Sequence, residues 1–111
     1  MARTRMTALL ERRAEERRRL AVARARAALD WLARQGVEAA VVGSLARGTF
    51  RGHSDVDILV MACPQHLKYA IEGGVEDRME GLPFDVLYLD ELREPDRAKV
   101  LADATSAADL I

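Results

Sequence analysis

One stretch decides how this chain folds: Gly43-Ser44-Leu45-Ala46-Arg47-Gly48-Thr49-Phe50-Arg51-Gly52-His53-Ser54-Asp55-Val56-Asp57. The apolar residues 39–42 precede it, and the apolar run Ile58-Leu59-Val60-Met61 follows it. Short apolar runs bounded by turn residues are typical of strands. The pattern therefore predicts a strand, a tight turn, a short helix and a second strand that begins with two aspartates.

The residue types in this stretch suit the binding of a phosphate and a metal ion. Asp55 and Asp57 would project from the same face of the second strand, with Cα atoms roughly 6–7 Å apart. Oxygen ligands so placed suit Mg²⁺, which takes its other ligands from substrate phosphates and water. Gly43 lets the backbone approach a phosphate closely. Ser44 is predicted to cap the short helix, whose free N–H groups attract anions.

The other elements are predicted from apolar periodicity and from glycine and proline positions. They are a helix over 4–35, strands over 37–42, 54–61 and 84–89, a helix from Pro64 to about Glu80, and a helix from Pro95 to about Ala104. Gly73-Gly74 would interrupt the middle helix, since two glycines cost roughly 2 kcal/mol relative to alanines. Residues 108–111 are expected to form a short edge strand.

Asp85 stands out within the third predicted strand, Phe-Asp-Val-Leu-Tyr-Leu. A carboxylate is costly to bury unless it has a partner or a function. From the residues alone two interpretations stay open. Asp85 either joins Asp55 and Asp57 in one site, or it lies at an exposed strand end.

Length and charge indicate the general class of protein. The 111 residues fit a single domain, and no apolar run approaches the ~20 residues of a membrane span. One cysteine allows no internal disulfide, so a cytoplasmic location is expected. Residues 1–35 carry ten arginines against four acids, whereas the rest of the chain is acidic. We therefore predict one domain over 1–111, with a basic helical arm (1–18) projecting from a core (19–111).

The combination of Gly-Ser, ten further residues and Asp-x-Asp, followed by Asp85, resembles the signature of the DNA polymerase β-like nucleotidyltransferase superfamily. The chain is most similar to its small minimal nucleotidyltransferases. The resemblance implies an α/β (α+β) fold with a mixed sheet, a palm-like core and, here, a long N-terminal helix. It implies that Gly43, Ser44 and Arg47 bind the nucleotide phosphates. It also implies that Asp55, Asp57 and Asp85 are catalytic and hold two Mg²⁺ ions, with ATP as the substrate.

Minimal nucleotidyltransferases resemble the antitoxin partners of helical HEPN ribonuclease toxins. The resemblance implies transfer of AMP from ATP to a tyrosine of such a toxin. One alternative is an antitoxin that neutralises by binding alone. A second is a nucleic-acid-binding module that uses the Arg-rich helix, although that helix lacks the aromatic residues that stack on bases. The helix could also join two copies of the chain.

Overall fold

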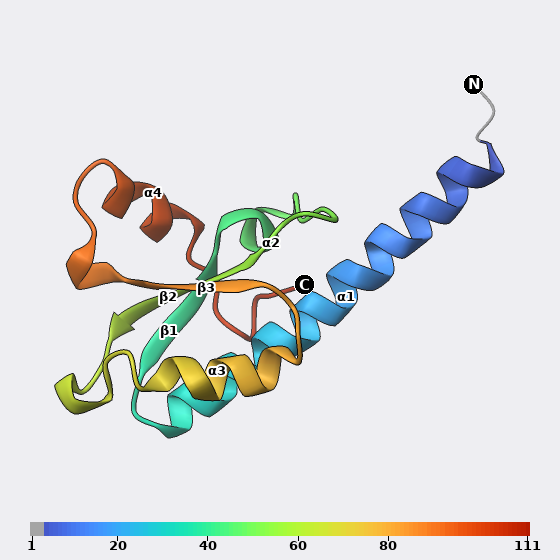
Figure 1. The fold of residues 1–111 in the computed structure, drawn as a ribbon. Coiled ribbons are helices and arrows are strands. Elements are labelled where there is room, and N and C mark those ends of the chain that lie inside the picture. The colour runs from blue at the N-terminus through green and yellow to red at the C-terminus, as the bar shows by residue number, and fades with distance from the viewer. Residues whose placement is uncertain (1–3) are drawn as a thin grey trace.

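The computed structural model describes residues 4–111, which form a three-stranded mixed sheet with helices packed mainly on one face (Figure 1). The strands are β1 (Glu38–Val42), β2 (Val56–Ala62) and β3 (Phe84–Tyr88), in the order β1-β2-β3. β1 pairs antiparallel with β2, and β2 pairs parallel with β3. β2 is thus the central strand, and Ile58, Leu59 and Val60 are all buried, as their apolar run predicts.

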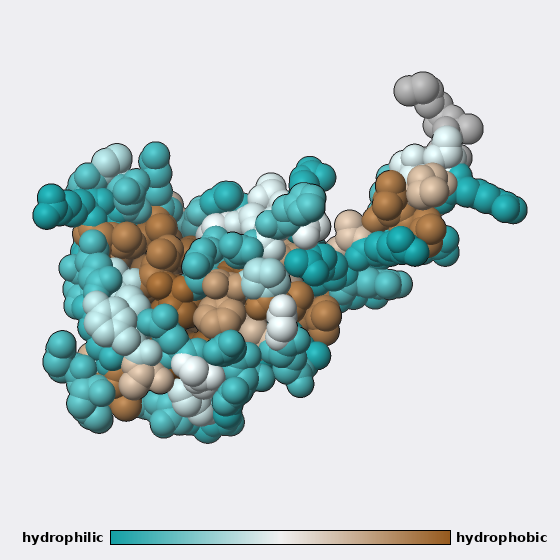
Figure 2. Space-filling model, in the orientation of Figure 1, coloured by the Kyte–Doolittle hydropathy of each residue, from teal (hydrophilic) through white to brown (hydrophobic). Residues whose placement is uncertain are grey.

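The long helix α1 (Arg5–Arg34) has two parts with different surroundings. Thr4 caps its start by accepting a hydrogen bond from the Thr7 backbone N–H. Its second half packs against the sheet through residues at helical spacing, namely Ala21, Val22, Ala25, Ala28, Leu29 and Leu32. The first half extends away from the sheet (Figure 1), and Met6 and Leu10 are 63% and 55% exposed there. Figure 2 shows the apolar surface that this part of the helix presents.

The connection from β2 to β3 differs from the prediction. A short 3-10 helix, η1 (Gln65–Leu67), follows Pro64, and the α-helix α3 (Ile71–Met79) begins only after Tyr69. The break therefore precedes Gly73-Gly74, and the prediction of an interruption at these glycines was wrong. α3 runs through them because the Trp31 ring of α1 needs the space beside Gly74, where a Cβ would lie 2.1 Å from a Trp31 ring carbon. Gly74 thus serves helix packing.

After β3, a second 3-10 helix, η2 (Leu89–Glu91), leads to α4 (Asp96–Asp103), close to the helix predicted there. α4 lies on the side of the sheet away from α1 and α3 (Figure 1). The chain then returns to the free edge of β1, where Thr105 and Val41 exchange two backbone hydrogen bonds of 2.9 Å.

The predicted edge strand over 108–111 is absent from the described chain, because this segment packs on α1 instead. Leu110 is buried in the core, and Arg26 donates hydrogen bonds to the carbonyl oxygens of Ala107 and Leu110. No helix in residues 4–111 is both long enough and apolar enough to cross a membrane.

Candidate active site

Two of the predicted site residues lie side by side on neighbouring strands. Asp57 is the second residue of β2, Asp85 is the second residue of β3, and the two are directly paired in register. Adjacent strands lie about 4.8 Å apart, and paired residues point to the same side of a sheet. Val56, Ile58 and Val60 alternate with Asp57 and belong to the core formed with the helices. Asp57 and Asp85 therefore share the opposite face of the sheet.

Asp55 lies just before β2, two residues from Asp57, at the end of the loop that follows the short helix α2 (Gly43–Arg47). A tight turn shapes this loop. The Arg51 N–H donates to Ser54 Oγ at 2.8 Å, and the Ser54 N–H donates to the Arg51 carbonyl oxygen at 2.9 Å. Phe50 anchors the other end of the loop in the core. The loop thus delivers Asp55 to the same end of the sheet as Asp57 and Asp85.

The pKa of Asp57 shows that the three carboxylates affect one another. Burial is the main cause that raises this pKa above its ordinary value, and the negative charges of Asp85 and Asp55 raise it further. The Arg47 guanidinium acts in the opposite direction and favours the charged form of Asp57. A half-buried carboxylate beside two others is the environment in which a bound cation relieves the most repulsion.

Gly43 lies directly against Asp57. Val42, the last residue of β1, is the in-register partner of Asp57, and the chain turns into α2 at the next residue. Gly43 makes this turn with a φ of +73°, a conformation that side chains disfavour. A Cβ at this position would lie 2.4 Å from Asp57 Oδ2. Any residue other than glycine would therefore displace the Asp57 carboxylate. Glycine also lets the backbone at residue 43 lie close to the site.

Ser44 does not cap α2, and that prediction was wrong. The helix already begins at Gly43, so Ser44 lies within its first turn, and no side-chain hydrogen bond caps this helix. The Ser44 carbonyl oxygen accepts the Thr49 N–H at 2.9 Å and so helps close the turn after α2. The Ser44 hydroxyl makes no hydrogen bond to a residue of the described chain, which leaves it free for a ligand.

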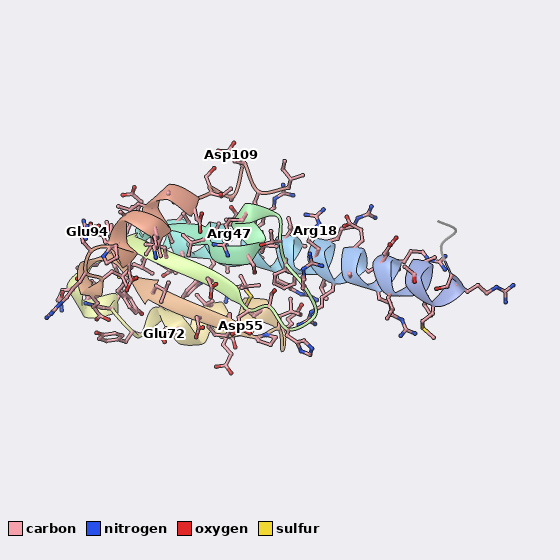
Figure 3. The ribbon with its side chains drawn as sticks, turned by 90° about the horizontal axis from the view of Figure 1, so that it is seen from above. Arg18, Arg47, Asp55, Glu72, Glu94 and Asp109 are labelled. Carbon is pink, nitrogen blue, oxygen red and sulfur yellow. The ribbon has the colours of Figure 1, made fainter. Side chains whose placement is uncertain are left out.

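Arg47, the last residue of α2, is held by an acid that sequence reasoning did not single out. Its Nη1 atom donates to Asp103 Oδ2 of α4 at 2.6 Å. The two residues are 56 positions apart, and no local pattern links them, so the sequence carries no signal for this pair. The contact joins α4 to the end of α2 on the side of the sheet where Asp57 and Asp85 lie. Figure 3 shows Arg47 and Asp55 from above.

The residues fit Mg²⁺ that binds together with a nucleotide. No three His, Cys, Asp or Glu side chains of residues 4–111 form a complete metal cage by themselves. Mg²⁺ does not require one, because it binds through one or two carboxylates and takes substrate phosphates and waters as its other ligands. Asp55 and Asp85 are exposed and Asp57 is half-buried. The donor set and its mutual repulsion fit such an ion, and Gly43 leaves the Asp57 carboxylate in place to bind it.

Comparisons with known proteins show the family to which the chain belongs. Residues 22–107 match the family model of the nucleotidyltransferase domain. This chain belongs to that family. The matched range includes Gly43, Ser44, Arg47 and all three aspartates, and it leaves out the first part of α1. None of the curated proteins compared with the chain matches it.

A solved structure described as "Structure of putative minimal nucleotidyltransferase" is similar to this chain. The TM-score is 0.60 at 30% sequence identity, and the match covers 82% of this chain and 89% of the other. The shared fold confirms the predicted mixed α+β class. Family and fold together support a transferase, and the three aspartates Asp55, Asp57 and Asp85 lie at one end of its sheet.

Proposed function

We propose that this nucleotidyltransferase moves AMP from ATP to a hydroxyl group of another protein, and that the acceptor is a tyrosine of a HEPN-type ribonuclease toxin. The observation that carries the proposal is the in-register pair Asp57–Asp85 beside Gly43. Family membership supports nucleotide transfer. The finer assignment to ATP, to a tyrosine and to such a toxin rests on the resemblance to antitoxin-type minimal nucleotidyltransferases. A cytoplasmic location belongs to the same proposal.

Each residue has a distinct role in this proposal. The backbone at Gly43 and the hydroxyl of Ser44 contact the phosphates, and Arg47 neutralises part of their charge. Asp55, Asp57 and Asp85 hold Mg²⁺, and Asp85 also orients the acceptor hydroxyl and takes its proton. When bound, two Mg²⁺ ions supply charge stabilisation for the attacking and leaving oxygens of an in-line displacement. Positioning and charge neutralisation are the main requirements of phosphoryl transfer.

The exposure of the site favours a protein as the acceptor. Asp55 and Asp85 lie on the surface, so a large molecule can bring its own hydroxyl to them. An acceptor protein would then have to be held by another part of the chain. The first half of α1 offers a surface for this purpose.

We assign acceptor binding to the groove between α1 and the loop that leads to Asp55. This groove has a volume of about 350 Å³ and is lined by Thr7, Leu10, Glu11, Ala14, Phe50, Arg51 and Gly52. Leu10 and Ala14 supply exposed apolar surface, and Arg51 and Glu11 both line the groove. Arg12 and Arg13 are exposed elsewhere on the first half of α1 and would steer an acidic partner towards this part of the chain. The groove therefore fits the apolar anchor of a protein segment that these arginines attract.

Ion pairs within α1 argue against the nucleic-acid alternative. Glu15 accepts hydrogen bonds from both Arg18 and Arg19, and these bonds hold the pKa of the Glu15 carboxyl below its ordinary value. A charged Glu15 compensates part of the positive charge that would attract a phosphate backbone. A protein partner is therefore favoured over a nucleic acid.

The proposal is tested with α-labelled ATP, Mg²⁺ and the protein encoded beside this one. We expect label on a tyrosine of that neighbour and loss of its ribonuclease activity. Binding and neutralisation without label would instead show an antitoxin that acts by binding. Absence of both binding and label would overturn the choice of acceptor.

A further inference from the structure

A second cluster of reactive side chains lies at the other end of the sheet and has no role in the site described above. Its centre is Tyr69, a residue that is 56% exposed. The Tyr69 hydroxyl donates a hydrogen bond to the Glu91 carboxylate. Lys68 Nζ lies 3.0 Å from the same carboxylate oxygen and also contacts Asp90. The hydrogen bonds from Tyr69 and then Lys68 hold the pKa of the Glu91 carboxyl below its ordinary value, so an exposed phenol is paired with a charged carboxylate.

The fold holds Tyr69 in this position through several contacts. Its φ is +69°, a left-handed conformation that is unusual for a bulky residue and often marks a functional position. The Tyr69 N–H donates to the Tyr88 hydroxyl at 3.1 Å, and that hydroxyl donates to Glu72 at 2.6 Å. The two rings meet edge to face, with centroids 4.9 Å apart. These contacts fix the Tyr69 side chain, so its hydroxyl is already positioned for contact with another molecule.

Tyr88 is a natural comparison, because it is the only other tyrosine of the chain. Its side chain is 5% exposed and its hydroxyl is engaged with both Glu72 and the Tyr69 backbone. The pKa of both phenols lies above its ordinary value, chiefly through burial for Tyr88 and chiefly through the hydrogen bond to Glu91 for Tyr69, so exposure is what distinguishes them. The chain therefore presents a single accessible phenol, Tyr69.

We propose that Tyr69 is itself an acceptor for nucleotide transfer, and that a second copy of the chain modifies it. This inference rests on the proposed function, since it uses the same site and the same donor. Tyr69 Oη would form a bond to the α-phosphorus of ATP. The bond from that phosphorus to the bridging oxygen of pyrophosphate breaks and pyrophosphate leaves. The phenol proton passes to Glu91, which already accepts its hydrogen bond and here replaces Asp85 as the proton acceptor. The product is a tyrosyl–AMP ester on Tyr69.

The geometry requires a second copy. Tyr88 lies three residues beyond Asp85 on β3, which is about 10 Å along the strand. Tyr88 also points into the core that α1 and α3 cover, whereas Asp57 and Asp85 lie on the opposite face. Tyr69 packs on Tyr88, so the sheet separates its hydroxyl from the aspartates of its own chain. Only the site of another copy can approach it.

Modification would remove the contacts that hold this surface together. An AMP group on Tyr69 Oη replaces the proton that Glu91 accepts, and it places a phosphodiester charge beside Asp90 and Glu91. Like charges at this distance repel each other. The modified surface would therefore differ in charge and hydrogen bonding from the unmodified one, which gives the transfer a way to regulate association between copies.

The test uses the full-length chain, ATP and Mg²⁺, and identifies modified peptides by mass spectrometry. We expect a mass gain of one AMP group on Tyr69 and none on Tyr88. The Tyr69→Phe variant, which keeps the ring but lacks the hydroxyl, should gain none. Glu91→Gln should slow the modification of Tyr69 at least about tenfold, as expected when a proton acceptor is removed.

A mixing experiment tests the requirement for a second copy. Asp57→Ala cannot transfer but retains Tyr69, and Tyr69→Phe can transfer but cannot accept. We expect AMP on the Asp57→Ala chain only when both variants are present. If Tyr69 of the wild-type chain gains AMP but the mixture leaves the Asp57→Ala chain unmodified, the inference is overturned.

Failure of the inference and failure of the proposed function give different results. AMP on the neighbouring acceptor protein with Tyr69 unmodified would overturn only the inference. No transfer to either protein would overturn both.

Discussion

Gly43 and Asp57 determine the geometry of the site at the scale of single residues. The glycine is the only residue type that allows the turn out of β1 and also leaves the Asp57 carboxylate in place. A side chain here has two separate consequences. It strains the backbone, and it displaces a carboxylate on which transfer is proposed to depend.

Gly43→Ala should separate these two effects when it is compared with Gly48→Ala. Both glycines have positive φ, but a Cβ at Gly48 has nothing within 4 Å. Both variants should lose roughly 1–2 kcal/mol of unfolding free energy from backbone strain. Gly43→Ala should also lose about 100-fold in transfer rate, because small misplacements of reacting groups are costly. Urea unfolding and AMP transfer measure the two effects. Equal transfer rates in both variants would contradict the role of Gly43.

Asp57→Asn should stabilise the protein at neutral pH. The folded state raises the pKa of Asp57 above its ordinary value of 3.8, so the charged form disfavours folding. This destabilisation is absent below the ordinary value and is fully present above the raised one. The variant should therefore unfold at a higher temperature than wild type at neutral pH, and the difference should vanish below pH 3.8. Thermal unfolding at both pH values checks this, and a less stable variant at neutral pH would refute it.

The sequence predicted some site residues better than others. Asp55 and Asp57 could be recognised because both lie in one short segment with a strand directly after it. Asp85 could be placed on a strand, but its partner could not be derived, because strand pairing depends on contacts distant in sequence. Asp103 and Glu91 were missed because their partners, Arg47 and Tyr69, are 56 and 22 positions away.

At the scale of elements, α3 shows how tertiary packing overrides local propensity. Its two adjacent glycines predict a broken helix, yet the helix is continuous because Trp31 of α1 packs on Gly74. Arg78 also packs on the Trp31 ring, with its guanidinium 4.7 Å from the ring centroid. It also donates to the Gly74 carbonyl oxygen at 3.1 Å.

Substitution of these two glycines should change stability in opposite directions. Gly73→Ala has no atom within 4 Å of the added Cβ, so better helix propensity should stabilise the protein by about 0.5–1 kcal/mol. Gly74→Ala would place a Cβ 2.1 Å from the Trp31 ring and should cost about 1–3 kcal/mol through overpacking. Unfolding free energies in urea give both values. A stabilising Gly74→Ala would show that Trp31 moves aside at little cost.

The order and type of the main elements could be predicted because each has its own periodicity or turn residues. The helix over 5–34, three strands and the last helix were all expected, with ends that differ by one or two residues. The packing of residues 108–111 on α1 was not expected, because their apolar side chains are equally compatible with pairing to a strand and with packing on a helix. The arginine that decides the matter, Arg26, lies 81 positions before Ala107.

At the scale of the whole molecule, the chain is elongated, with extents of 54 × 31 × 22 Å. Its charges are segregated along this length. Arg18 lies on α1 and Glu94 lies at the end away from the projecting part of that helix (Figure 3). Residues 72–96 include nine acids and two arginines. A chain with one basic and one acidic end favours contacts with other charged proteins, including copies of itself.

Removal of residues 1–16 should weaken partner binding and leave the nucleotide site intact. This truncation keeps Arg17, whose guanidinium lies 5.9 Å from the Phe50 ring centroid, and so preserves the anchor of the loop before Asp55. Affinity for ATP with Mg²⁺ should change less than about twofold, while labelling of the acceptor protein should fall at least about tenfold through slower association. Calorimetry and label incorporation measure the two quantities. Loss of ATP affinity with unchanged binding of the acceptor protein would show that the removed segment belongs to the nucleotide site.

Transfer of AMP from α-labelled ATP, with and without Mg²⁺, tests the central claim most directly. The purified chain is incubated alone and with the protein encoded beside it, and label in protein is counted. Asp57→Asn is compared with Asp77→Asn, an exposed aspartate of α3, the helix on the other face of the sheet. We predict Mg²⁺-dependent label for wild type and Asp77→Asn, and a loss of at least about 100-fold for Asp57→Asn, as for removal of a group that stabilises the transition state. Equal labelling by the two variants would contradict the assignment of this site.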